Sequence, residues 1–115
     1  MIRKISWYHQ IINEDSEPGE LVNERQVNLE EALIILASLP RTVHGSPGEI
    51  RGFIAEDGSF LEFLREDVDA IHVRYENPNN EIYRMGVLNY QEAREMLIDF
   101  FAGRRLRWLD KLEPY

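Results

Sequence analysis

Four runs of about eight residues between positions 49 and 88 constrain the fold more than any other feature of the sequence. They read EIRGFIAE, SFLEFLRE, DAIHVRYE and EIYRMGVL, and apolar and polar residues alternate within them. A period of two is typical of strands that bury one face. Asp57-Gly58, a strong β-hairpin signal, joins the first two runs, and the turn-forming NPNN joins the last two. We therefore expect an antiparallel meander with one buried face.

Two further strands are expected ahead of the meander. Residues 2–12, IRKISWYHQII, alternate in the same way, and the apolar face consists of Ile5, Trp7, His9 and Ile11. The acidic stretch NEDSEPGE is predicted to be an exposed turn, because it contains Pro18 and Gly19. The following LVNERQV is expected to pair back onto the first strand.

Two helices are predicted, over residues 29–39 and 90–102, and each follows the pattern Asn-x-x-Glu. The pairs are Asn28 with Glu31 and Asn89 with Glu92. An asparagine at this position caps the helix start, and the glutamate returns a hydrogen bond to the backbone of the cap. Pro40 and Gly103 are suited to follow the two helix ends. The tail RRLRWLDKLEPY is expected to add a last short strand, with Leu106 and Trp108 turned to the same side.

Length and composition indicate a single α+β domain spanning residues 1–115. We expect an antiparallel sheet of about five or six strands, with both helices packed on one face. The chain has no cysteine, which excludes disulfides and thiolate metal sites and fits a reducing cytoplasm. Its start does not resemble a signal peptide, and its apolar runs are too short to span a bilayer. A cytoplasmic protein is therefore expected.

A tight arginine cluster, Arg104, Arg105 and Arg107, contrasts with the formal net charge of -8. Residues 90–115 contain five acidic and five basic side chains, so the cluster neutralises its own end of the chain. Cations after a helix end interact favourably with its carbonyls, and we therefore expect a role in the fold. Nucleic-acid contact is disfavoured by the excess of acidic residues. Contact with a protein partner stays open as the alternative.

No catalytic, cofactor or metal site is predicted. The three histidines have no metal-ligand spacing. His9 is expected in the core and His72 in solvent, whereas His44, in a loop, is placed like a catalytic residue but has no nucleophile motif near it. Trp7 and Trp108 are expected to be mostly buried, since each sits in an apolar alternation. The paired carboxylates occur in turns and at strand ends, where solvation is the default rather than acid–base catalysis.

The sequence as a whole resembles immunity protein family one of bacterial polymorphic and contact-dependent toxin systems. The likeness rests on the early strand ISWYH, the helix LEEALIILASL, the EDGSFLEF hairpin, and a last helix that leads through FF and Gly-Arg to a tryptophan. It covers roughly residues 5–110, although Arg105 stands where members often have a proline. The resemblance implies a protein that binds and neutralises a cognate toxin, often a nuclease or nucleic-acid deaminase, without catalysis.

The acidic turns are the predicted contact surface, because carboxylates steer the approach of a basic partner. The candidate residues are Glu14, Asp15, Glu17, Glu56, Asp57, Glu66, Asp67 and Asp69. Three alternatives stay open. In the first, the acidic turns are merely solvated. In the second, the protein is a small regulatory or scaffold domain that binds another protein. In the third, it is a small-ligand carrier or enzyme. A deep pocket lined by His44, His72 and carboxylates would favour the last of these.

Overall fold

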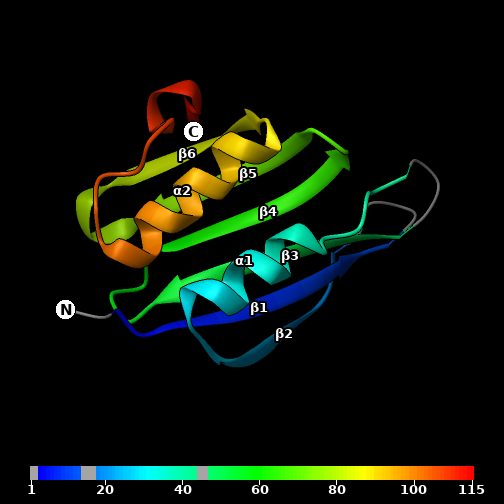
Figure 1. Cartoon of the computed structure of the whole chain (residues 1–115), viewed down its shortest axis with the longest axis horizontal. Helices are drawn as coiled ribbons and strands as arrows, with labels where there is room; N and C mark the ends of the chain where they lie inside the picture. Colours follow the sequence, from blue (N-terminus) through cyan, green and yellow to red (C-terminus); the bar gives the residue numbers. More distant parts are fainter. Residues whose placement is uncertain (1–2, 14–17, 44–46) are drawn as a thin grey trace.

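The chain forms one antiparallel sheet covered on one face by two helices (Figure 1). The structure is a computed structural model that describes residues 3–13, 18–43 and 47–115. In these residues seven strands lie in the order β2-β1-β3-β4-β5-β6-β7, with every neighbouring pair antiparallel. The predicted α+β class is confirmed, and the sheet has more strands than the five or six expected. The strands are β1 (Ile5–Ile12), β2 (Pro18–Val27), β3 (Gly48–Ala55), β4 (Phe60–Asp67), β5 (Ala70–Asn77), β6 (Ile82–Leu88) and β7 (Glu113–Pro114).

The core lies between the sheet and the helices α1 (Leu29–Ala37) and α2 (Tyr90–Ala102). The register sets Phe53 opposite Leu61 and Phe63 opposite Val73, so their side chains share the helix-covered face. The helices bury Leu36, Met96, Leu97 and Phe100 against them. Each such side chain contributes about 1.5 to 3 kcal/mol when it leaves water. The alternation in the sequence therefore identified the buried face of the meander.

Both predicted capping boxes are present. Asn28 Oδ1 accepts from the Glu31 amide at 2.8 Å, and Asn89 Oδ1 accepts from the Glu92 amide at the same distance. Each glutamate carboxylate accepts from the backbone amide of its cap. Gly103 ends α2 in the left-handed region, with φ of 70°, as its predicted role requires. The first helix is shorter than predicted, because Ser38 rather than Leu39 caps it.

The tail differs from the sequence prediction. Its strand, β7, lies at Glu113–Pro114, and a short 3-10 helix, η2 (Leu109–Lys111), precedes it. Leu106 is buried, but Trp108 is 40% exposed and has φ of 67°. The period of two does not apply here, because the chain between α2 and η2 is not a strand. The expectation that Trp108 is a core residue is therefore wrong, and Trp7 is half-buried against the core.

Two expectations for the first hairpin are also wrong. Pro18 and Gly19 belong to β2 rather than to the turn. His9 lies on the helix side of β1, but its register partners are Arg51 and Val22 rather than core residues. His9 Nε2 is 2.8 Å from Glu24 Oε1, and the ring remains partly exposed. His72 points outward into solvent, as predicted.

One edge of the sheet has an irregular ladder, and the other is partly covered. The β1–β2 ladder has two register shifts, one between Ser6 and Tyr8 and one between Gln10 and Ile12. Such bulges twist an edge strand and interrupt its row of hydrogen-bonding groups. At the other edge β7 and η2 lie against β6. Neither helix in the described ranges is long and apolar enough to cross a membrane.

Candidate functional site: the uncovered face of the sheet

The helices leave the opposite face of the sheet uncovered in the described part of the chain (Figure 1). We call this surface the open face. The strand register arranges its side chains in three rows across the strands. The first row is Leu21, Gln10, Ile50, Leu64, His72 and Val87. The second is Asn23, Tyr8, Gly52, Glu62, Arg74, Met85 and Glu113. The third is Gln26, Ser6, Ile54, Phe60, Glu76 and Tyr83.

The centre of the open face is an ionic network. Tyr8 donates its hydroxyl hydrogen to Glu62 Oε2 at 2.6 Å, and Arg74 Nε lies 2.6 Å from Glu62 Oε1. Arg74 Nη1 lies 3.8 Å from Glu76 Oε2, and Tyr115 donates a hydrogen bond to the same carboxylate. Two carboxylates thus share one guanidinium, which leaves the network with net negative charge.

The backbone of Gly52 holds the network in place. Tyr8 is only 6% exposed although no helix covers it, because its ring lies across Gly52 on the neighbouring strand. A Cβ atom at position 52 would lie 2.1 Å from Tyr8 Cζ. An aromatic ring over a strand glycine covers backbone that would otherwise be exposed. The position of the Tyr8 hydroxyl is therefore fixed by packing.

The network also changes proton affinities. Burial and the neighbouring Glu62 carboxylate raise the pKa of Tyr8 well above its usual range. Burial and the hydrogen bond to Glu76 raise the pKa of Tyr115 to about 12. Burial by itself lowers the pKa of Arg74, but the pairing with Glu62 outweighs it and the net shift is upward. The tyrosines are thus neutral donors and Arg74 a permanent cation.

Apolar side chains flank the network on the exposed surface. Leu21, Ile54, Met85 and Val87 are exposed large apolar residues of this face. A hollow of about 660 Å³ lies beside the network, with an apolar lining that includes Ile12, Ile50, Leu64, Met85 and Val87 and a polar lining that includes Gln10, Glu62, His72 and Arg74. His72 Nε2 is 3.1 Å from Glu66 Oε2 at its margin. The open face therefore combines apolar area with an acidic centre.

The described acidic turns lie at opposite ends of the sheet rather than together. Glu56 and Asp57 connect β3 to β4, whereas Glu66, Asp67 and Asp69 surround the turn from β4 to β5. An eight-residue strand such as β4 separates them by about 26 Å. The two turns bracket the open face instead of forming one patch. Glu14, Asp15, Glu17 and His44 lie outside the described residues.

Three of these carboxylates also stabilise the fold. Asp57 accepts hydrogen bonds from the amide and hydroxyl of Ser59, at 2.9 and 2.6 Å, and these bonds hold its pKa below the usual range. Asp67 accepts from the amide of Val68. Asp69 accepts from the amide of Tyr90, the first residue of α2, at 2.8 Å. These three aspartates therefore have a structural role in addition to their candidate role in partner contact.

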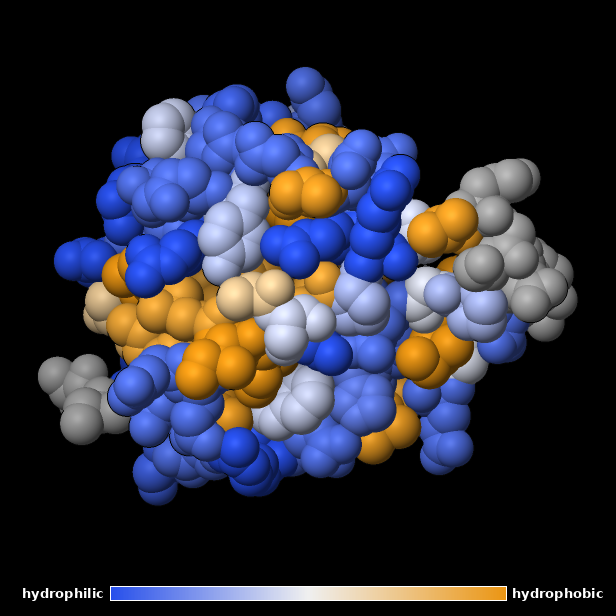
Figure 2. All heavy atoms as spheres, turned by 45° about the vertical axis from the view of Figure 1, so that its right-hand side comes forward, coloured by the Kyte–Doolittle hydropathy of each residue, from blue (hydrophilic) through white to orange (hydrophobic). Residues whose placement is uncertain are grey.

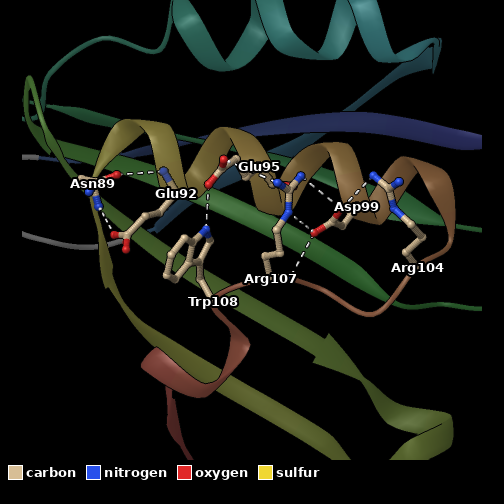
Figure 3. Close-up of polar contacts among 7 residues, drawn as sticks. All are labelled: Asn89, Glu92, Glu95, Asp99, Arg104, Arg107 and Trp108. Atoms are coloured by element: carbon tan, nitrogen blue, oxygen red, sulfur yellow. Dashed lines mark hydrogen bonds and ion pairs between the residues drawn. The ribbon is translucent and has the colours of Figure 1, made fainter.

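The arginine cluster has the structural role that the sequence indicates. Asp99, on α2, is 3% exposed and accepts from Arg104 Nη2, from Arg107 Nε and from the Arg107 backbone amide, each at 2.9 Å. Trp108 donates its indole hydrogen to Glu95 one turn earlier (Figure 3). These bonds fasten the tail along α2. Arg105 differs, since it is largely exposed and lies 3.7 Å from an equally exposed Asp110.

The helix side carries a second hollow, a groove of about 670 Å³ between the start of α1 and the end of α2. Its apolar lining consists of Val27, Leu29, Ile98, Phe101 and Ala102. Figure 2 shows an apolar band between polar margins on this side. Arg3, Arg104 and Glu31 give the groove a rim of mixed charge, which indicates no particular partner. Across the described residues, no group of three or more His, Asp or Glu side chains could hold a metal ion.

Comparison of the chain with protein-family models, with curated proteins and with solved structures finds no match.

The sequence-based search missed the central residues of the open face. Glu62, Arg74 and Glu76 occupy the polar positions of β4 and β5, which the alternation identified only as solvent-facing. Opposite charges at such positions are a signal for cross-strand pairing. The pairing could not be assigned, because a shift of one residue in the register would separate the two side chains.

Proposed function

We propose that the protein is an immunity protein that binds and neutralises a cognate bacterial toxin domain, without enzymatic activity of its own. The observation that supports this most is the open face. A broad sheet surface that no described helix covers, with exposed apolar side chains around an acidic centre, is the kind of surface that marks a protein interaction site. The ladder at the β2 edge is irregular and β7 covers part of the β6 edge, so we expect a partner that uses the sheet to approach its face.

The charge of the open face supports a basic partner. Its three rows contain the carboxylates Glu62, Glu76 and Glu113 and a single arginine or lysine, Arg74. The chain as a whole has a formal net charge of -8. Nucleases and nucleic-acid deaminases bind phosphate backbones with basic surfaces, which an acidic inhibitor complements. The resemblance to immunity protein family one leads to the same class of partner.

The acidic turns are proposed to supply the outer charge of this interface. Rim charges act mainly on the association rate and on its salt dependence. Reversal of Glu56 and Glu66 should slow association and weaken its dependence on salt, while leaving the fold intact. These two are preferred to Asp57, Asp67 and Asp69, because the aspartates hold backbone amides.

The decisive experiment uses the product of the gene immediately upstream. We expect this product to arrest growth when expressed alone, and co-expression of the present chain to restore growth. Met85→Arg with Val87→Arg, on the open face, should abolish protection. Ile34→Arg is the control, since Ile34 is also apolar and even more exposed but lies on α1 on the other side of the sheet.

Two results would contradict the proposal. The first is an upstream product that is harmless and does not bind, which would favour a regulatory or scaffold role. The second is full protection by the Met85 and Val87 variant together with loss of protection by the Ile34 variant. That result would move the interface to the helix side.

A further inference from the structure

We propose that the hollow on the open face receives an arginine or lysine side chain of the partner protein. The inference rests on the proposed function, which places the partner on this face. It adds the chemical group that the partner inserts and the residues that recognise it.

The lining of the hollow matches the two parts of such a side chain. Ile50, Leu64, Met85 and Val87 provide an apolar wall along one side. Lysine and arginine have long aliphatic stems that pack on apolar surface while the charged group stays at a polar margin. Glu62 and His72 belong to the polar lining of the hollow, and Glu66 stands just outside it, with its Oε2 3.1 Å from His72 Nε2. A stem and a cationic head therefore both find complementary partners.

The charges around the hollow favour a cation. The lining itself has one carboxylate, Glu62, and one guanidinium, Arg74, and two more carboxylates, Glu66 and Glu76, pair with the lining residues His72 and Arg74 from outside it. Glu62 is already nearly covered, with 12% of its side chain exposed, whereas 62% of the Glu66 side chain is exposed. Arg74 is the one arginine or lysine in the lining, and Glu62 and Glu76 already share it. A partner that covers this surface removes water from carboxylates that outnumber the cations beside them. Uncompensated charge is costly to bury, so a bound partner is expected to bring a cation of its own.

An anionic or purely apolar group is a poorer fit to the same hollow. A carboxylate would meet Glu62 in the lining and the charges of Glu66 and Glu76 beyond it, against the single cation Arg74, and would be repelled. An apolar group would pack against the apolar wall but would leave Glu62 and Glu66 without water or a counter-charge. The hollow therefore has a preference that small probes can measure without the partner.

The test is a titration of the full chain with hexylguanidinium, followed by NMR of the methyl groups. Hexanol and hexanoate, with the same tail and a neutral or negative head, are the comparison probes. We expect hexylguanidinium to shift the methyl signals of Ile50, Leu64, Met85 and Val87, with a dissociation constant on the order of millimolar. Hexanol and hexanoate should bind at least about tenfold more weakly, and added salt should weaken the guanidinium binding.

Two variants separate recognition from general attraction to an acidic protein. Glu66→Gln should weaken hexylguanidinium severalfold, and it is safe for the fold because the side chain is exposed. Glu56→Gln removes an exposed carboxylate at the other end of β4, remote from the hollow, and should leave binding unchanged. Glu62→Gln extends the series if its unfolding midpoint stays near that of the wild type.

Equal binding of the three probes, methyl shifts confined to the helix-side groove, or an equal response of Glu66→Gln and Glu56→Gln would overturn the inference. The proposed function fails by a different result, a harmless upstream product. Because the titration needs only the chain and a small cation, it gives its answer whichever way the growth assay turns out.

Discussion

The replacement Asp99→Asn tests whether the arginine cluster belongs to the fold. Asp99 is nearly inaccessible to solvent and accepts from two arginine side chains and one backbone amide. Asparagine keeps the shape but removes the charge and turns an amide donor toward guanidinium donors. Breaking a fully buried ion pair costs about 3 to 5 kcal/mol. Here the guanidiniums lie at the surface, so water screens them. We therefore expect a loss of about 2 kcal/mol.

Urea unfolding followed by circular dichroism measures this loss. At a typical slope, about 2 kcal/mol moves the midpoint by about 1 M without changing the slope itself. The matched control is Arg105→Gln, which removes the exposed neighbour and should leave the midpoint unchanged. If Asp99→Asn unfolds at the wild-type midpoint, or if Arg105→Gln is equally destabilised, the tail is not held by Asp99 and the structural assignment of the cluster is refuted.

Four further predictions follow from the contacts. Burial by itself raises the pKa of Asp99, but the hydrogen bonds and charges of Arg107 and Arg104 outweigh it and hold the pKa below its ordinary 3.8. The stability that Asp99 contributes is therefore complete above pH 3.8 and is lost as the pH falls through the lowered value, so acid should shift the urea midpoint less in Asp99→Asn than in wild type. The pKa of Tyr115 is raised to about 12 from an ordinary 10, so the stability that its neutral hydroxyl contributes is present below pH 10 and is lost as the pH rises from 10 to 12. The absorbance of tyrosinate at alkaline pH measures this ionisation. Gly52→Ala should cost about 1 to 3 kcal/mol in urea unfolding, because the new methyl group meets the Tyr8 ring, and an unchanged midpoint would contradict that packing. Trp108→Ala should cost about 1 kcal/mol in the same assay, since the indole is partly exposed and the backbone is left-handed, and a loss near the 3 to 5 kcal/mol typical of core aromatics would restore the sequence-based expectation.

Local signals were the reliable part of the sequence. Asn28 and Asn89 with their glutamates determined two helix starts, because a capping box involves residues only three positions apart. The Asp57-Gly58 turn was equally local, and Gly58 has the positive φ that such a hairpin needs. Trp108 was misplaced because the period of two was extended past Gly103 into a segment held by side chains rather than by a strand ladder.

The site depended on contacts that are distant in the sequence. Tyr8 and Glu62 are 54 residues apart, and only the register of β1, β3 and β4 brings them together. The charge of the acidic turns was visible in the sequence, but their positions at the two ends of β4 follow from the sheet order. The proposal of a basic partner came from the composition, whereas the location of the candidate surface required the fold.

The division of the sheet into a covered and an open face also bears on how the protein can evolve. The core residues that hold the fold lie on the helix side, whereas Ile54, Met85 and Val87 have large exposed fractions and no place in the core. Substitutions at such surface positions usually change stability by less than about 0.5 kcal/mol. Under the proposed function, partner preference can therefore change through these three positions with little loss of stability. Gly52 and Tyr8 cannot drift in this way, since each fixes the position of the other.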